Sequence, residues 1–241
     1  KFIMAYTTIK KSSDYFNTKL YTGNGATQSI TGVGFQPDWI WLKGRSAISD
    51  HKINDVIRGT DSYLSSNNSA AEDTTGSGIQ SYDSDGFSLS NAGNINDNSV
   101  TYASWNWLGA NGTSANTDGS ISSTVSANTT SGFSIVKYIG NGGSSGTVGH
   151  GLGVVPKMII TKVISAAGDN WKVYHVGSGN AKVLELNTTI AQATSGAWNN
   201  TTPTSSVFSL GNDGATNGSG KTIIAYCFAD VQGYSKFGSY T

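Results

Sequence analysis

The sequence predicts an all-β protein built from two tandem β-sandwich units, and three observations support that prediction. Charged residues make up only 12% of the 241 residues, against roughly 25% in a typical globular protein. Thr, Val, Ile, Tyr and Trp, which favour strands, recur in short runs separated by glycine, whereas good helix formers are scarce. The same pattern of runs occurs twice along the chain. Hydrophobic residues, at 37%, are numerous enough to form a packed core.

An internal repeat organises the chain. The string Tyr-Thr-Gly-Asn-Gly at residues 21–25 reappears 117 residues later as Tyr-Ile-Gly-Asn-Gly. Residues 32–43 align with residues 151–162, which brings a glycine, a proline and a lysine into step at an offset of 119. Residues 102–107 then fall opposite residues 224–229, at an offset of 122. So small a drift indicates two copies of one unit with a few short loop insertions.

The repeat also predicts the boundaries of the units. We assign residues 1–108 to the first β-sandwich unit and residues 132–241 to the second. Residues 109–131 between them are small, polar and almost uncharged, with too little apolar surface to pack alone. This composition predicts a linker, with Ile121 and Val125 docked on a neighbouring unit.

The end of the chain predicts one further strand. Residues 234–241 resemble the strand that opens each unit, cut short before its Gly-Asn-Gly string. We therefore expect a terminal strand that starts a third copy or closes the sheet of a preceding one. Either arrangement predicts a longer array or a strand exchanged between neighbouring molecules.

Within each unit, hydrophobic residues alternate with the period of a strand. Trp39 and Trp41 share one face of a strand and Ile40 and Leu42 share the other, so this strand is expected to be covered on both sides. Asn-Gly and Asp-Gly pairs supply tight turns, and strand runs about ten residues apart are typical of a sandwich or jelly roll. Further strands are expected at residues 53–57, 79–82, 86–89, 100–107, 171–175, 182–186, 207–210 and 222–228.

Charge and cysteine content exclude several classes of partner. With 15 basic and 15 acidic residues and no block of either sign, the chain lacks the electrostatic pattern of a protein that binds nucleic acid or an anionic membrane. No apolar run approaches the roughly 18 residues of a membrane span, and no signal peptide is evident. Cys227 cannot form an internal disulfide because it is the single cysteine, and its apolar surroundings predict a buried, unreactive thiol.

The acidic residues do not predict an enzyme. Glycoside hydrolysis requires two carboxylates about 5–10 Å apart across a cleft. Asp83 and Asp85 flank a turn, and Glu72 and Glu185 are isolated in the sequence. We therefore expect no catalytic residues.

Histidines and loop oxygens give no evidence for a metal or cofactor. The chain has no His-x-x-His or Cys-x-x-Cys pair. His150 lies between glycines, where a histidine satisfied within a tight turn is expected, and His51 and His175 have no partner in the sequence that would indicate catalysis. The oxygens of Asp83 and Asp85 and those of residues 94–98 resemble a calcium loop weakly, but turn formation explains the same residues. We expect no metal and no cofactor.

Two pairs of tryptophans are the candidate ligand-binding residues. Trp39 and Trp41, and likewise Trp105 and Trp107, lie two residues apart and so present flat rings on one side of a strand. If exposed, these four rings could stack against sugars. If buried, they belong to a core or a subunit interface. Their hydrophobic neighbours favour burial.

The repeated strings resemble a family of repeat-bearing bacteriophage proteins, from viruses of marine bacteria and cyanobacteria, that comprises tail-fibre and other virion structural proteins. The resemblance runs from about Met4 to the end. It implies a lectin-like β-sandwich of the jelly-roll or concanavalin-like type, and the family offers no established catalytic residues to carry over. The strings that carry it lie at residues 21–25, 32–43, 51–59 and 84–87 in the first unit and 150–160, 170–175 and 225–228 in the second.

The resemblance and the composition lead to one expected function and two alternatives. We expect a non-enzymatic virion protein at the particle surface, of the tail-fibre type, that assembles with copies of itself or with other virion proteins and recognises a host-surface glycan. The first alternative is a carbohydrate-binding module or adhesin. The second is a capsid decoration protein or the subunit of an extracellular filament.

Overall fold

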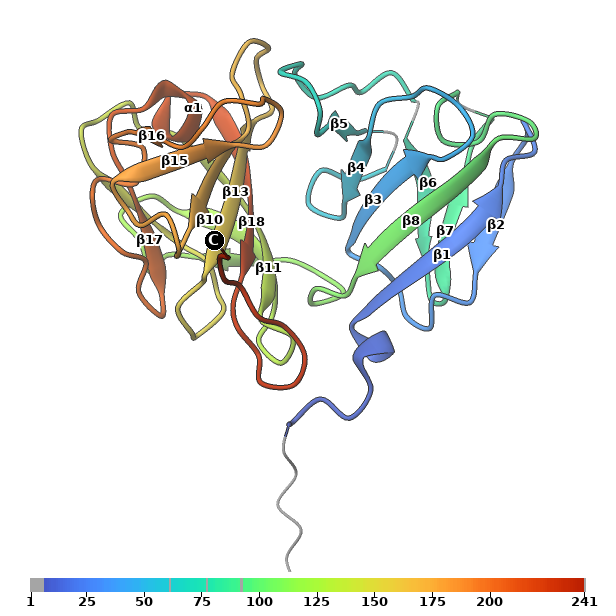
Figure 1. Ribbon diagram of the computed structural model, residues 1–241, viewed down its shortest axis with the longest axis horizontal. Coiled ribbons are helices and arrows are strands. Elements are labelled where there is room, and N and C mark those ends of the chain that lie inside the picture. Colours follow the sequence, from blue (N-terminus) through green and yellow to red (C-terminus); the bar gives the residue numbers. More distant parts are fainter. Residues whose placement is uncertain (1–6, 61, 77, 92, 241) are drawn as a thin grey trace, which may run out of the picture.

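The computed structural model describes residues 7–60, 62–76, 78–91 and 93–240 (Figure 1). It confirms the all-β prediction, because nearly all of its regular structure consists of strands in antiparallel sheets. The described helical elements are a 3₁₀-helix, η1 (Ser12–Asp14), and a four-residue helix, α1 (Gly214–Asn217). Neither has the length and apolar character that a membrane-crossing helix needs.

The first half of the chain forms two antiparallel sheets, which we call the first inner sheet and the first outer sheet. The inner sheet has the strand order β1-β8-β3-β4-β5, and the outer sheet has the order β2-β7-β6. The inner strands are β1 Phe16–Thr22, β8 Thr101–Trp107, β3 Trp39–Gly44, β4 Lys52–Asp55 and β5 Leu64–Ser65. The outer strands are β2 Gln28–Thr31, β7 Gly86–Leu89 and β6 Ile79–Asp83.

The strand that contains the first tryptophan pair is covered fully on one side and partly on the other, where Trp39 is buried and Trp41 is half-buried. Ile40 and Leu42 of β3 point into the core between the first inner and first outer sheets. Trp39 and Trp41 point to the opposite face of the inner sheet. The core between the two sheets also contains Ile30, Ile79, Phe87, Leu89 and Ile95.

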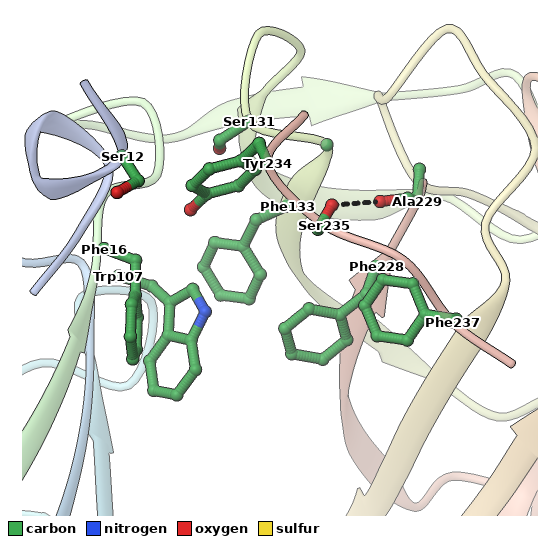
Figure 2. Close-up of a pocket in the computed structure, with 11 residues that line it drawn as sticks. Ser12, Phe16, Trp107, Ser131, Phe133, Phe228, Ala229, Tyr234, Ser235 and Phe237 are labelled. Atoms are coloured by element: carbon green, nitrogen blue, oxygen red, sulfur yellow. Dashed lines mark hydrogen bonds between the residues drawn. The ribbon is translucent and has the colours of Figure 1, made fainter. Parts of the chain in front are cut away.

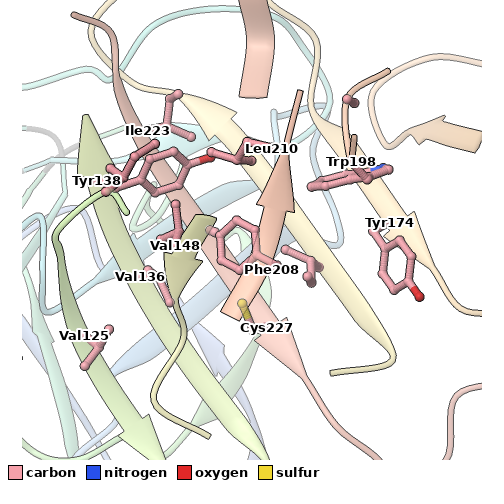
Figure 3. Packing of buried hydrophobic residues seen from close by; sticks show 14 of the residues in the cluster. Val125, Val136, Tyr138, Val148, Tyr174, Trp198, Phe208, Leu210, Ile223 and Cys227 are labelled. Atoms are coloured by element: carbon pink, nitrogen blue, oxygen red, sulfur yellow. The ribbon is translucent and has the colours of Figure 1, made fainter. Parts of the chain in front are cut away.

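The second half forms a larger second inner sheet and a two-stranded second outer sheet. The inner sheet has the order β16-β15-β14-β13-β18-β11-β10-β9, and the outer sheet pairs β12 with β17. The inner strands are β16 Ala193–Thr194, β15 Lys182–Glu185, β14 Lys172–His175, β13 Met158–Val163, β18 Thr222–Phe228, β11 Phe133–Ile139, β10 Ser123–Asn128 and β9 Ser114–Asn116. The outer strands are β12 Gly146–Gly149 and β17 Val207–Leu210. Figure 3 shows the core between them, which includes Val136, Tyr138, Val148, Phe208, Leu210 and Cys227.

The repeat seen in the sequence is also a repeat of topology. The order β11-β18-β13-β14-β15 in the second inner sheet matches β1-β8-β3-β4-β5 in the first. The outer pair β12-β17 likewise matches β2-β7.

Strand pairing corrects the sequence alignment of the last strand by one residue. Trp107 pairs with Phe16 on one side and Trp39 on the other, and Phe228 occupies the same position in the second inner sheet. Trp107 therefore corresponds to Phe228 and not to Ala229. The correction matters because a one-residue slip along a strand transfers every side chain to the other face.

The segment expected to be a linker contributes two strands to the second inner sheet. Strands β9 and β10 lie within residues 109–131, and β10 pairs with β11 from Ser123 to Asn128. The hydroxyl of one serine in this segment is satisfied inside the fold, since Ser123 Oγ donates to Gly149 O at 2.9 Å. Ile121 and Val125 are buried in the core of the second half, in agreement with the expected docking.

A buried carboxylate anchors the start of this segment to the first half. Asp38 is fully buried, and its Oδ2 accepts hydrogen bonds from the N–H groups of Gly109, at 2.7 Å, and Asn111, at 3.3 Å. Burial raises the pKa of Asp38 to about 6, although these hydrogen bonds act in the opposite direction.

This raised pKa gives a pH dependence of stability with a definite sign. The folded state binds the proton of Asp38 more tightly than the unfolded chain, so we expect the contribution of Asp38 to stability to fall as pH rises from about 4 to about 6. A shift from 3.8 to about 6 corresponds to at most about 3 kcal/mol. Urea unfolding of the wild-type chain and of Asp38→Asn at several pH values measures this contribution. The stability difference between the two proteins is expected to change across that range in favour of Asp38→Asn. Parallel stability curves would contradict the prediction.

The Gly-Asn-Gly string of each half is held by a buried asparagine that the sequence analysis did not identify. Asn96 accepts the N–H of Asn24 through Oδ1, at 3.1 Å, and that of Gly25 through its carbonyl, at 2.9 Å. In the second half, Asn217 holds Asn141 in the same way, at 3.0 Å. The repeated string is therefore held by a structural clamp, and residues 94–98, which resemble a calcium loop only weakly, contain one of the two clamping asparagines.

The end of the chain does not form the expected terminal strand. Described residues 234–240 belong to no strand, and Val231 forms a single bridge with Ser235. The segment instead packs on its own chain, because the N–H of Phe237 donates to Asp230 Oδ1 at 2.8 Å and Phe237 contacts the hydrophobic core. Residue 241 of the predicted strand lies outside the described residues. The segment therefore finds its contacts within its own chain in this structure.

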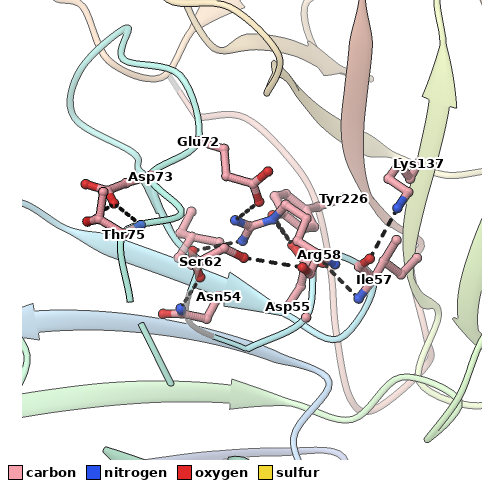
Figure 4. A network of polar contacts seen from close by, with 12 residues as sticks. Asn54, Asp55, Ile57, Arg58, Ser62, Glu72, Asp73, Thr75, Lys137 and Tyr226 are labelled. Carbon is pink, nitrogen blue, oxygen red and sulfur yellow. Dashed lines mark hydrogen bonds and ion pairs between the residues drawn. The ribbon is translucent and has the colours of Figure 1, made fainter. Parts of the chain in front are cut away.

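The two inner sheets pack against each other through equivalent faces. Across this contact, Tyr226 Oη donates to Asp55 Oδ2 at 2.8 Å (Figure 4). Trp171 Nε1 also donates across it, to Ser65 O at 3.0 Å. The buried core at the contact contains Trp39, Ile53, Ile57 and Leu64 from the first half and Phe133, Ile135, Ile160, Ile164, Trp171, Val173, Ile224, Tyr226 and Phe228 from the second.

Candidate ligand-binding cleft

The four candidate tryptophans lie on one face of the first inner sheet. Antiparallel pairing of β3 with β8 sets Trp39 opposite Trp107 and Trp41 opposite Trp105. This is the face that meets the second inner sheet. Because that sheet covers only part of it, the four rings differ in burial.

Trp39 is a core residue. It is 1% exposed, and its ring centroid lies 4.4 Å from that of Trp107, 4.7 Å from that of Tyr226 and 5.6 Å from that of Phe133. It therefore does not have the exposure that sugar stacking needs. Trp41, Trp105 and Trp107 are half-buried.

A pocket lies where the two inner sheets meet, and we call it the junction pocket (Figure 2). Its volume is about 330 Å³. Phe16 and Trp107 come from the first inner sheet, and Phe133 and Phe228 come from the second. The C-terminal segment adds two more aromatic rings. The full lining consists of Ser12, Phe16, Trp107, Ser131, Gly132, Phe133, Phe228, Ala229, Tyr234, Ser235 and Phe237.

A second hollow extends from the junction pocket along the first inner sheet, and we call it the tryptophan platform. Its volume is about 420 Å³, and its lining consists of Phe16, Trp41, His51, Trp105 and Trp107. The two hollows share Phe16 and Trp107 and so lie next to each other, and we call the pair the aromatic cleft. Its aromatic rings come from β1, β3, β8, β11, β18 and the C-terminal segment.

The aromatic cleft is uncharged at neutral pH. Its two linings contain no lysine, arginine, aspartate or glutamate. His51 is the one titratable imidazole in these linings, and burial together with the nearby charge of Lys43 lowers its pKa below the ordinary value. An imidazole whose pKa is below 6.5 is mostly neutral at pH 7.

Three buried polar atoms in the lining of the cleft lack a hydrogen-bond partner within the described part of the chain. Ser131 is 4% exposed, and its Oγ forms no hydrogen bond within the described part of the chain. Trp41 Nε1 and His51 Nδ1 are likewise buried and unpartnered among the described residues. Leaving a buried donor or acceptor unsatisfied costs about 1–3 kcal/mol. Unsatisfied groups therefore favour a site that a ligand completes.

Comparison with known proteins identifies the family of the chain. A family model described as a domain of unknown function, DUF7483, matches residues 11–241. The chain belongs to this family. The match spans both halves of the internal repeat, and with them every residue that lines the aromatic cleft. Searches of curated proteins and of solved structures gave no match.

The C-terminal residues of the cleft were missed by sequence reasoning. Ser235 Oγ donates to Ala229 O at 3.0 Å, and the ring of Tyr234 meets that of Tyr15 edge-on at 6.2 Å. Phe237 packs against Phe228 at 5.9 Å. The aromatic residues of this segment are the available signal in the sequence, but their pattern predicts a strand that the segment does not form.

The carboxylates considered from the sequence have structural roles. Asp85 accepts the N–H groups of Gly34, at 2.7 Å, and Gly32, at 2.9 Å, and these bonds keep the pKa of Asp85 below its ordinary value. The other three make these contacts: Asp83 with Ser81 and Ser88, Glu72 with Arg58, and Glu185 with Lys172. None of the four lines the aromatic cleft.

Cys227 is buried, as expected, and His150 is buried as well. His150 Nε2 lies 3.1 Å from Thr204 O, and Nδ1 accepts the N–H of Leu152 at 3.2 Å. The prediction that His150 is satisfied within the fold is confirmed. Burial raises the pKa of the Cys227 thiol to about 12, which keeps it protonated and unreactive at neutral pH.

Proposed function

We propose that this chain is a non-enzymatic recognition module that binds an uncharged glycan in the aromatic cleft. The observation that carries the proposal is the continuous, half-exposed surface formed by Phe16, Trp41, Trp105 and Trp107. Aromatic rings of this kind bury large apolar areas at little cost in side-chain entropy. The apolar faces of sugar rings are suited to such a surface.

The charge of the cleft favours a neutral glycan over a nucleic acid. Nucleic acid bases also stack on aromatic side chains, but proteins that bind single strands combine stacking with a positively charged groove. The lining of this cleft has no lysine or arginine. Acidic glycans would likewise find no counter-charge there.

The same lining supports binding without hydrolysis. Glycosidases of the common type act through two carboxylates that flank the scissile bond. Since no carboxylate lines the cleft, we propose that the bound glycan remains intact.

Replacing Trp105 with alanine is expected to weaken glycan binding at least about tenfold, because one stacking surface is lost. The probes are hexasaccharides of β-1,4-linked glucose, mannose and N-acetylglucosamine, with hexagalacturonate as an acidic comparison, and affinity is measured by isothermal titration calorimetry. Tyr240→Ala is the matched control, because Tyr240 is 100% exposed and lies outside the cleft lining. Binding of hexagalacturonate alone, or no neutral hexasaccharide binding tighter than about 1 mM, would contradict the proposal.

We further propose the surface of a virion as the setting, with copies of the chain associated there. This part rests on the resemblance of the repeated strings to phage tail-fibre and virion proteins. The alternative of a capsid decoration protein or filament subunit has less support, since the C-terminal segment packs on its own chain. Light scattering at increasing protein concentration tests self-association, and a monomer throughout would contradict it.

A further inference from the structure

We infer that the aromatic cleft recognises the end of a glycan chain, with the terminal sugar unit in the junction pocket and the following units on the tryptophan platform. This inference rests on the proposed function and specifies its ligand. It follows from three observations: the different walls of the two hollows, the barrier between the halves, and an unpartnered hydroxyl in the pocket.

The two parts of the cleft differ in how many walls they have. The tryptophan platform is lined by residues of the first half alone, namely Phe16, Trp41, His51, Trp105 and Trp107. The junction pocket has walls from both inner sheets, from the hairpin between β10 and β11 and from the C-terminal segment. A chain that lies along the platform therefore leads into a more confined space.

The C-terminal segment closes this space by spanning the two halves. The ring of Tyr234 meets that of Tyr15, at 6.2 Å, directly before Phe16 on β1. Phe237 packs on Phe228 of the second inner sheet, at 5.9 Å. Figure 2 shows Tyr234, Phe228 and Phe237 around the pocket, opposite Phe16 and Trp107. An extended chain that passes Trp107 meets this barrier, so a chain end fits the pocket better than a chain interior.

The dimensions and polar groups of the junction pocket suit a terminal sugar unit. At about 330 Å³ it lies at the lower end of the range for small-molecule sites, roughly 300–1,000 Å³. Ser131 Oγ is buried in its lining without a hydrogen-bond partner among the described residues. The Ser131 hydroxyl can both donate and accept a hydrogen bond. It therefore suits the additional hydroxyl group that a terminal sugar unit carries and an internal unit lacks.

The test compares chain ends on the hexasaccharide of the neutral panel that binds most tightly. One derivative has its non-reducing terminal hydroxyl methylated, and the other has its reducing end converted to the alditol. We expect one of the two changes to weaken binding about tenfold and the other to have little effect. In Tyr234→Ala and in Ser131→Ala, the unmodified hexasaccharide is expected to bind less tightly and the difference between the two derivatives is expected to shrink.

The controls separate this inference from the proposed function. Tyr240→Ala alters an exposed aromatic residue in the same C-terminal segment of the protein. This variant is expected to retain both the glycan affinity and the preference for one end of the glycan. Thermal unfolding of each variant verifies that it is folded. If both end-modified sugars bind like the parent while Trp105→Ala still weakens binding, the inference of end recognition is wrong and glycan binding stands. If Trp105→Ala also has no effect, the proposed function fails as well.

Discussion

Replacing Arg58 with alanine is expected to lower the free energy of unfolding by about 3–5 kcal/mol, because it leaves buried carboxylate charge without its partner. Arg58 Nε lies 2.5 Å from Asp55 Oδ2, and Nη1 lies 3.2 Å from Glu72 Oε1 (Figure 4). The side chains of Arg58 and Asp55 are 1% and 0% exposed. Asp55 also accepts the hydroxyl of Tyr226 from the second half, so the same network joins the two inner sheets.

Urea unfolding followed by tryptophan fluorescence measures this effect. Arg45→Ala is the matched control, since Arg45 is exposed and forms no ion pair among the described residues. A surface substitution of this kind is expected to change stability by no more than about 0.5 kcal/mol. Equal unfolding midpoints for Arg58→Ala and Arg45→Ala would show that the buried network contributes little.

Replacing Trp39 with alanine is expected to cost a similar amount, about 3–5 kcal/mol, for a different reason. The substitution leaves a cavity at the contact between the inner sheets, where the Trp39 ring packs against Trp107, Tyr226, Phe133 and Phe228. The surrounding strands are fixed by their pairing and can collapse only partly into the space.

The stability of Trp105→Ala is the control for the stability of Trp39→Ala. Trp105 lies on the same face but is half-buried, so its removal is expected to destabilise the chain clearly less than removal of Trp39. For glycan binding we expect the opposite order. Trp105→Ala removes a ring that contacts the glycan, whereas Trp39→Ala removes a core ring that does not. If both variants unfold at the same urea concentration, the distinction between core and platform tryptophans is wrong.

The fold class could be predicted from the sequence because it depends on local signals. Strand-favouring runs, Asn-Gly turns and alternation around Trp39 to Leu42 are readable without knowledge of the partner sheet. The internal repeat was equally visible. The sequence alignment of its last strand is wrong by one residue. Matching apolar residues in two sequences does not reveal which face of the strand each side chain occupies. The pairing of Trp107 with Phe16 and Trp39 in the structure does.

The site was only partly predictable, because the packing of the two halves decides it. The sequence indicates that the four tryptophans share a face, but not that the second inner sheet covers Trp39 and leaves Trp41 and Trp105 half-exposed. Tyr234 and Phe237 could not be assigned to the cleft, since no local pattern shows where a chain end folds back. The serines of β10 likewise resembled a linker because their partners, such as Gly149, lie far along the sequence.

Oxidation of tryptophans by N-bromosuccinimide, located by mass spectrometry, tests the central claim most directly. In the free chain we expect Trp41, Trp105 and Trp107 to react, while Trp39, Trp171 and Trp198, at 0–1% exposure, stay intact. A saturating neutral hexasaccharide is expected to protect the three reactive rings. The claim that the aromatic cleft binds an uncharged glycan is contradicted if these rings are oxidised equally with and without every neutral hexasaccharide of the panel.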